Sequence, residues 1–126
     1  MIQLSVDPGL KAVCPTLVLG CVQAKVKVEK SSPELFAALE DQGRALASSL
    51  VLEEIGSHPR LAASREAYKK LGKNPSRYRN SAEALRRRIA QGKGLYYINN
   101  VVDINNLISL KTATSAGSYD LAGLKG

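Results

Sequence analysis

Residues 95–121 read LYYINNVVDINNLISLKTATSAGSYDL and organise the C-terminal part of the chain. Asn99 or Asn100 can cap a helix, because an asparagine side chain accepts hydrogen bonds from the free backbone N–H groups of a first helical turn. Asp103 would then lie near the positive end of that helix. Apolar residues follow at helical spacing in two rows, with Asn105 between them. The first row holds Val101, Ile104 and Ile108, and the second holds Leu107 and Leu110. The stretch predicts a helix, then a turn-rich linker ending in Tyr-Asp-Leu.

The segment immediately before this stretch is strongly basic. Residues 60–93 hold eleven basic and two acidic residues, a net charge of +9, whereas the rest of the chain holds seven basic and nine acidic residues, a net charge of −2. Such segregation is typical of an anion-binding face. A solvated helical surface is the alternative interpretation.

Two segments near the N-terminus have the pattern of strands. Residues 1–6 form a short apolar run that ends at a turn signal. Residues 17–28 alternate in their second half, where Val22, Val26 and Val28 share one side and lysines occupy the other. A period of two predicts a sheet with one face in water.

Helices are predicted over most of the remaining chain. The first begins at Pro33, capped by Ser32, and runs to about residue 55. The second covers residues 59–71, and the third begins at residues 80–81 and ends near residue 92. Together with the helix after Asn99, this order predicts an α+β fold. We expect N-terminal strands that form part of an antiparallel sheet, packed with about four helices.

The motifs of residues 95–121 resemble the B3/B4 domain of the phenylalanyl-tRNA synthetase β subunit. The matching residues are Val101, Val102, Asp103, Asn106, Tyr119 and Asp120. Residues 65–89, REAYKKLGKNPSRYRNSAEALRRRI, are similar to free-standing B3/B4-domain proteins, which lack the ligase. The resemblance covers about residues 60–124 and implies a single B3/B4-like domain over residues 1–126. In the family more strands follow the Tyr-Asp-Leu segment, so we expect this domain to be incomplete at its C-terminus.

The resemblance also implies a function. The synthetase domain hydrolyses mischarged aminoacyl-tRNA, so the expected partner is tRNA or aminoacyl-tRNA, with trans-editing ester hydrolysis and no ligase activity. A family threonine of the substrate pocket corresponds to Asn105 and a family histidine to Gly117, so the identities are altered, and no catalytic residue is assigned. The residues expected to contact RNA are Arg65, Lys69, Lys73, Arg77, Arg79, Arg86, Arg87 and Lys93. The alternatives are a non-catalytic RNA-binding or structural B3/B4 remnant and an amino-acid pocket without RNA.

Neither a metal nor a cofactor is expected. Cys14, Cys21 and the single His58 do not form a metal-ligand motif, and no phosphate-binding glycine motif is present. Both cysteines are expected to be reduced and buried, as in a cytoplasmic protein, and a redox pair is the alternative. The longest apolar run, residues 12–21, is too short to span a membrane. Since an unpaired sheet edge can recruit another chain, a homodimer is also expected.

Overall fold

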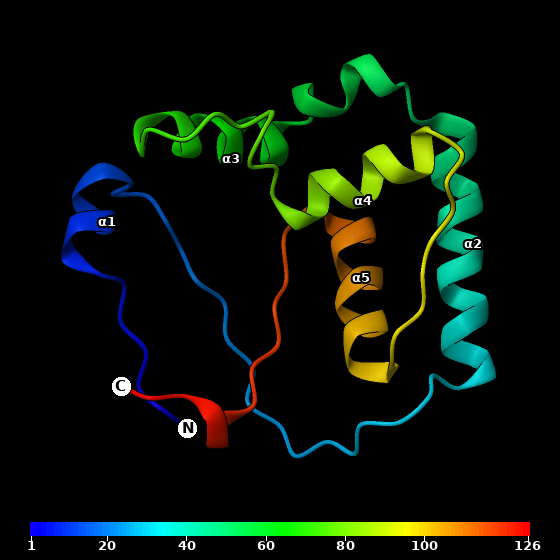
Figure 1. Cartoon of the computed structure of the whole chain (residues 1–126), viewed down its shortest axis with the longest axis horizontal. Helices are drawn as coiled ribbons and strands as arrows, with labels where there is room; N and C mark the ends of the chain where they lie inside the picture. The colour runs from blue at the N-terminus through cyan, green and yellow to red at the C-terminus, as the bar shows by residue number, and fades with distance from the viewer.

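The computed structural model describes all residues from 1 to 126 and consists of helices joined by extended segments (Figure 1). Helices α2, α4 and α5 pack together, α3 and the 3-10 helix η1 flank α4, and α1 lies apart from this bundle (Figure 1). The elements are α1 (Pro8–Val13), α2 (Pro33–Ser49), η1 (Leu52–Ser57), α3 (Pro59–Lys70), α4 (Ser81–Ala90), α5 (Asn100–Thr112) and η2 (Leu121–Gly123). None of the helices combines the length and the apolar character needed to cross a membrane.

Side-chain caps start the three bundle helices at the predicted places. The Ser32 hydroxyl accepts from the Leu35 N–H at 3.2 Å before α2. Asn80 Oδ1 accepts from the Glu83 N–H at 2.9 Å before α4, and Asn99 Oδ1 accepts from the Val102 N–H at 2.9 Å before α5. Each cap satisfies a backbone donor that has no partner inside its helix.

The predicted end of the first helix was wrong, because α2 stops at Ser49 and not near residue 55. The hydroxyls of Ser48 and Ser49 both donate to the Ala45 carbonyl, at 2.9 and 3.2 Å. Such local bonds from serine compete with the regular helical pattern. The chain becomes extended at Leu50 and then forms η1.

The core consists of two small apolar clusters. The first joins Leu39 of α2, Leu85 and Ile89 of α4, and Leu110 of α5. The second lies where η1, α3 and the start of α4 meet the end of α5, and it contains Ile55, Leu61, Ala82 and Ala113. Because α4 contributes to both clusters, it holds the two halves of the bundle together.

The start of α5 fixes the chain segment that enters α2. The Asn100 side chain donates to the Lys27 carbonyl at 2.9 Å and accepts from the Glu29 N–H at 3.1 Å, and its backbone N–H donates to the Glu29 carbonyl at 2.9 Å. The buried Asp103 carboxylate accepts from the Ser31 hydroxyl at 2.6 Å and from the Ile98 N–H at 3.1 Å. The contacts with Lys27, Glu29 and Ser31 join residues that are about seventy positions apart in the sequence.

The predicted α+β fold was wrong, because the structure is all helical and contains no sheet. Residues 1–6 and 17–28 are without strand structure, and the backbone of residues 18–28 makes hydrogen bonds only through Asn100. Alternation predicts which side chains share a face, but a strand also needs a neighbour that supplies a ladder of hydrogen bonds. In this chain no neighbouring strand is present, and the side chain of Asn100 bonds to the backbone of only two residues, Lys27 and Glu29.

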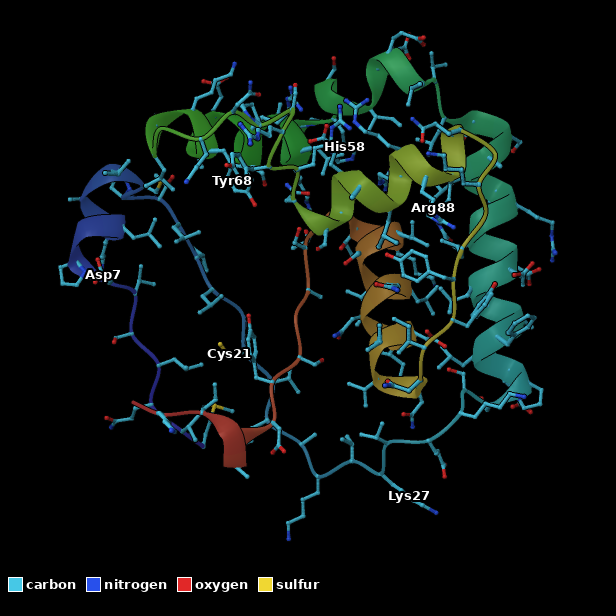
Figure 2. The ribbon with its side chains drawn as sticks, in the orientation of Figure 1. Asp7, Cys21, Lys27, His58, Tyr68 and Arg88 are labelled. Atoms are coloured by element: carbon cyan, nitrogen blue, oxygen red, sulfur yellow. The ribbon has the colours of Figure 1, made fainter.

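The same segment also corrects the expectation for the cysteines. Neither forms a disulfide, but Cys21 is exposed and Cys14 is only half-buried. Figure 2 shows Cys21 and Lys27 on the extended segment, away from the helices. The burial expected for Cys21 fails for the same reason as the sheet, since no element of the chain covers this segment.

Self-association stays a prediction, and the extended segment gives it a physical basis. Val22 is 94% and Val26 64% exposed. An exposed, apolar, unpaired extended segment favours pairing with another copy. We expect the average mass in light scattering to rise toward that of a dimer with increasing concentration, and the double substitution Val22→Lys, Val26→Lys to keep the protein monomeric. Adding two lysines on α2 instead, Ala37→Lys and Ala47→Lys, should leave association unchanged. A monomer at all concentrations contradicts the prediction.

Candidate functional site

A buried carboxylate lies at the centre of the basic segment. Glu83 is in the first turn of α4, where the Asn80 cap fixes its backbone, and its side chain is 1% exposed. Its Oε1 atom accepts from Arg65 Nη1 of α3 at 2.8 Å and from Arg87 Nε of α4 at 2.9 Å, and Arg79 Nε lies 3.9 Å away. One carboxylate thus gathers three guanidinium groups, here called the Glu83 cluster.

The Glu83 cluster leaves positive charge uncompensated, because three cations meet one anion. Arg65 also donates from Nη2 to the Ser76 hydroxyl at 3.0 Å, which holds the basic loop of residues 71–79 against α3. The second carboxylate oxygen of Glu83 is buried and has no hydrogen-bond partner. Fixed guanidinium groups with spare N–H donors favour an oxyanion such as phosphate or carboxylate.

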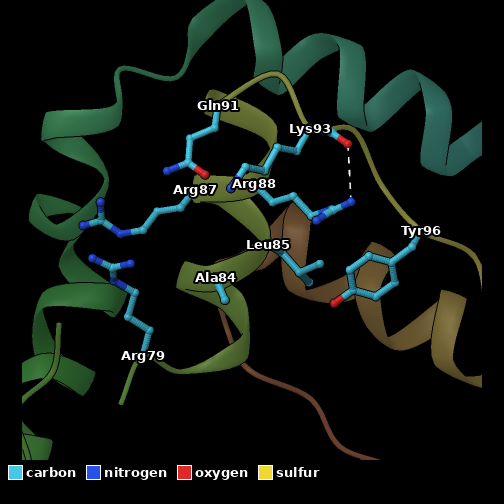
Figure 3. Close-up of a pocket in the computed structure, with 8 residues that line it drawn as sticks. All are labelled: Arg79, Ala84, Leu85, Arg87, Arg88, Gln91, Lys93 and Tyr96. Carbon is cyan, nitrogen blue, oxygen red and sulfur yellow. Dashed lines mark hydrogen bonds between the residues drawn. The ribbon is translucent and has the colours of Figure 1, made fainter. Parts of the chain in front are cut away.

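A cavity of about 270 Å³ opens beside this cluster (Figure 3). Its lining is rich in basic residues and consists of Arg79, Ala84, Leu85, Arg87, Arg88, Gln91, Lys93 and Tyr96. The Arg88 guanidinium lies 4.9 Å from the centroid of the Tyr96 ring, a cation–π contact, and its Nη2 donates to the Lys93 carbonyl at 3.4 Å. The lining contains no acidic residue, so the cavity is suited to an anion.

The structure brings some of the predicted RNA-contact residues together and separates others. Arg79, Arg87 and Lys93 line the cavity, and Arg65 belongs to the Glu83 cluster. Lys73 and Arg77 lie in the exposed loop, 5.0 and 5.6 Å from the centre of the Tyr78 ring, and Lys69 pairs with Glu66 on the surface of α3.

Arg86 points inward instead. It is 8% exposed, and its guanidinium donates to the Leu110 carbonyl of α5 at 2.8 Å. Burial lowers the pKa of this guanidinium from its ordinary value, because desolvation disfavours the charged form. Arg86 therefore joins α4 to the C-terminal end of α5, where a cation also meets the negative end of the helix dipole.

Sequence reasoning missed Arg88 and Tyr96, both of which line the cavity. Three consecutive arginines cannot share one helix face. The nearby aromatic pair Tyr96-Tyr97 was the sequence signal that one of these arginines could contact a ring. Tyr97 faces the core instead: its ring contacts Phe36, and its hydroxyl donates to Glu40.

The two residues at substrate-pocket positions lie close to each other. Asn105 is half-buried, and its Nδ2 donates to the Ser118 hydroxyl at 2.5 Å, next to Gly117. Gly117 lines a second cavity, of about 570 Å³, between α1, α3 and residues 115–119, which Asn105 does not line. A Cβ atom at position 117 would lie 3.4 Å from the Tyr119 hydroxyl and 3.5 Å from its ring. The hydrogen bond brings a side-chain amide and a hydroxyl together beside an exposed backbone.

One model of a known protein family matches this chain. The family model of the B3/4 domain matches residues 63–126, which include the Glu83 cluster, the basic cavity, Asn105 and Gly117. The protein is therefore a tRNA synthetase-related domain, and the chain belongs to the B3/4 domain family. The resemblance drawn from the sequence is confirmed. No curated protein and no solved structure matches the chain.

The Glu83 cluster generates a prediction about stability. Glu83→Gln removes the anion shared by Arg65 and Arg87, which are 22% and 19% exposed in their side chains and cannot lose their own charge. We expect a loss of about 1–3 kcal/mol in the free energy of unfolding, measured by urea denaturation. Glu66→Gln, which breaks an exposed ion pair on α3, should lose only about 0–1 kcal/mol. Equal losses in the two variants would show that the cluster does not stabilise the fold.

Proposed function

We propose that this domain binds tRNA or aminoacyl-tRNA through the basic surface formed by α3, the loop of residues 71–79 and α4. The observation that carries the proposal is the convergence of Arg79, Arg87, Arg88 and Lys93 on one cavity that has no acidic lining residue. The one carboxylate nearby, Glu83, is already engaged by Arg65 and Arg87. The cavity therefore has no internal counter-ion of its own.

RNA matches this surface physically. Its backbone presents regularly spaced phosphates, which basic side chains contact with the release of bound counterions. Lys73 and Arg77 in the exposed loop extend the positive charge beyond the cavity, over a surface larger than one phosphate. Membership of a tRNA synthetase-related family favours tRNA among RNAs. The proposal requires neither metal nor cofactor and implies a cytoplasmic protein.

Charge reversal tests the basic surface. Lys73→Glu, Arg77→Glu and Lys93→Glu change three residues that do not bond to Glu83, so the triple variant should keep its fold. We expect tRNA affinity to fall at least a hundredfold, because binding releases fewer counterions when each of these phosphate contacts is lost. The slope of log affinity against log salt concentration should become shallower. Filter binding or fluorescence anisotropy at several salt concentrations measures both quantities.

A control variant has the same net charge. Lys25→Glu, Lys111→Glu and Lys125→Glu change three exposed lysines that lie outside the basic surface. This variant should lose much less affinity than the first. If the two triple variants weaken binding equally, net charge alone is responsible and the localised surface is wrong. If the wild type binds no tRNA at low salt, the proposed function is wrong.

Ester hydrolysis is the second candidate function, and the pairing of Asn105 with Ser118 favours it. An amide and a hydroxyl beside Gly117 can orient a water molecule on the carbonyl carbon of an aminoacyl ester. The water oxygen would bond to that carbon, the ester C–O bond would break, and the tRNA hydroxyl would leave with a proton. The competing view, a non-catalytic RNA-binding domain, needs only the basic surface.

A pair of neighbouring asparagines separates the two views. Asn105→Ala removes the hydrogen bond to Ser118, whereas Asn106→Ala changes the next residue of the same helix and serves as control. If the domain is a hydrolase, Asn105→Ala should slow deacylation of a panel of mischarged tRNAs about tenfold or more, and Asn106→Ala should slow it less. Circular dichroism verifies folding of both variants. Absence of deacylation by the wild type, with tRNA binding intact, supports the non-catalytic view.

A further inference from the structure

The basic cavity beside α4 has two unlike walls and an apolar floor. Figure 3 shows Arg79 and Arg87 on one side, Arg88 and Tyr96 on the other, and Ala84 and Leu85 between them. One wall is therefore purely cationic, while the other presents an aromatic ring. A site for a simple inorganic anion would need only the first wall.

The cationic wall has donors to spare. Arg87 uses only Nε toward Glu83, at 2.9 Å, and Arg79 Nε is 3.9 Å from the same oxygen. The Nη groups of Arg79 and Arg87 and the Nζ of Lys93 make no hydrogen bond within the chain. Together they offer the forked donor pattern that suits phosphate oxygens.

The aromatic wall is prepared for a flat ligand. Tyr96 remains 50% exposed although the Arg88 guanidinium lies 4.9 Å from the centroid of its ring. Arg88 Nε is buried and has no hydrogen-bond partner, so the guanidinium is held against the ring and not turned toward the solvent. Bases of single-stranded nucleic acids stack on aromatic rings and on guanidinium planes in this way.

We propose that this cavity holds one unpaired nucleotide of an RNA strand, with its phosphate at Arg79, Arg87 and Lys93 and its base stacked on Tyr96. The volume of about 270 Å³ lies below the roughly 300–1,000 Å³ of sites that enclose drug-sized ligands, so the cavity holds one base and not a base pair. A base inside a duplex is already stacked on both faces and is not available to Tyr96. The inference rests on the proposed function and names the part of the RNA that this surface selects.

Selectivity for unpaired RNA provides the test. Fluorescence anisotropy compares a short single-stranded RNA of mixed sequence with the blunt duplex formed by the same RNA and its complement. Tyr96→Leu removes the ring without removing charge, so we expect about tenfold weaker binding of the single strand and less than twofold change for the duplex. The salt dependence should stay the same, because no phosphate contact is lost. Tyr96→Phe keeps the ring and should bind like the wild type.

Two further variants complete the experiment. Phe36→Leu removes another aromatic residue, 46% exposed, which packs on Tyr97 and does not line the cavity, and it should leave single-strand binding unchanged. Arg88→Lys keeps the charge but loses the planar group over Tyr96, so it should weaken binding of the single strand more than that of the duplex. This second route keeps the test valid if Tyr96→Leu lowers the melting temperature.

The outcomes separate the inference from the proposed function. If the wild type binds both RNAs and neither Tyr96→Leu nor Arg88→Lys changes the preference, the nucleotide site is wrong while the basic surface still binds RNA. Equal weakening of the single strand and the duplex by Tyr96→Leu also overturns the site. If the wild type binds neither RNA at low salt, both proposals fail.

Discussion

The buried carboxylate of Glu83 is the interaction on which the basic half of the molecule depends. Arg65 comes from α3, Arg79 from the loop before α4, and Arg87 from α4. Without the Glu83 carboxylate the like charges of these three residues would repel one another. The Asn80 cap sets where α4 begins and therefore where the Glu83 side chain enters the interior. A local backbone feature thus determines a contact between helices. Apolar packing governs the other half, where α2, α4 and α5 meet at Leu39, Leu85 and Leu110.

This division explains how the protein can gather so much positive charge and remain folded. One buried oxygen of Glu83 neutralises part of this charge, and the Nη groups of Arg79 and Arg87, which both line the cavity beside α4, make no hydrogen bond within the chain. A ligand with phosphates would supply the missing counter-charge from outside. Arg86 belongs to neither role, because it turns inward and binds the end of α5 through the Leu110 carbonyl. The segment that looks uniformly basic in the sequence therefore contains residues that hold the fold together and residues that remain available for binding.

The parts of the fold that depend on local chemistry could be predicted from the sequence. The caps Ser32, Asn80 and Asn99 mark helix starts that the structure confirms, since each accepts from an N–H group three residues away. The strands could not be predicted reliably, because strand formation depends on a partner that alternation does not reveal. The end of α2 was missed because the sequence does not reveal that the hydroxyls of Ser48 and Ser49 donate to the Ala45 carbonyl. In the site, charge counting found Arg79, Arg87 and Lys93 but not Tyr96, whose position follows from how the chain returns beside α4.

The ten residues of α4 contribute to nearly every part of this architecture. Leu85 and Ile89 fill the first cluster, Ala82 the second, Glu83 gathers the arginines, Arg86 holds α5, and Arg87 and Arg88 line the cavity. Among random variants of this protein, α4 should therefore be the segment with the least freedom to change. Residues 17–28, whose side chains are all exposed, lie at the opposite extreme. Divergence among related chains should accumulate in that exposed segment well before it reaches α4.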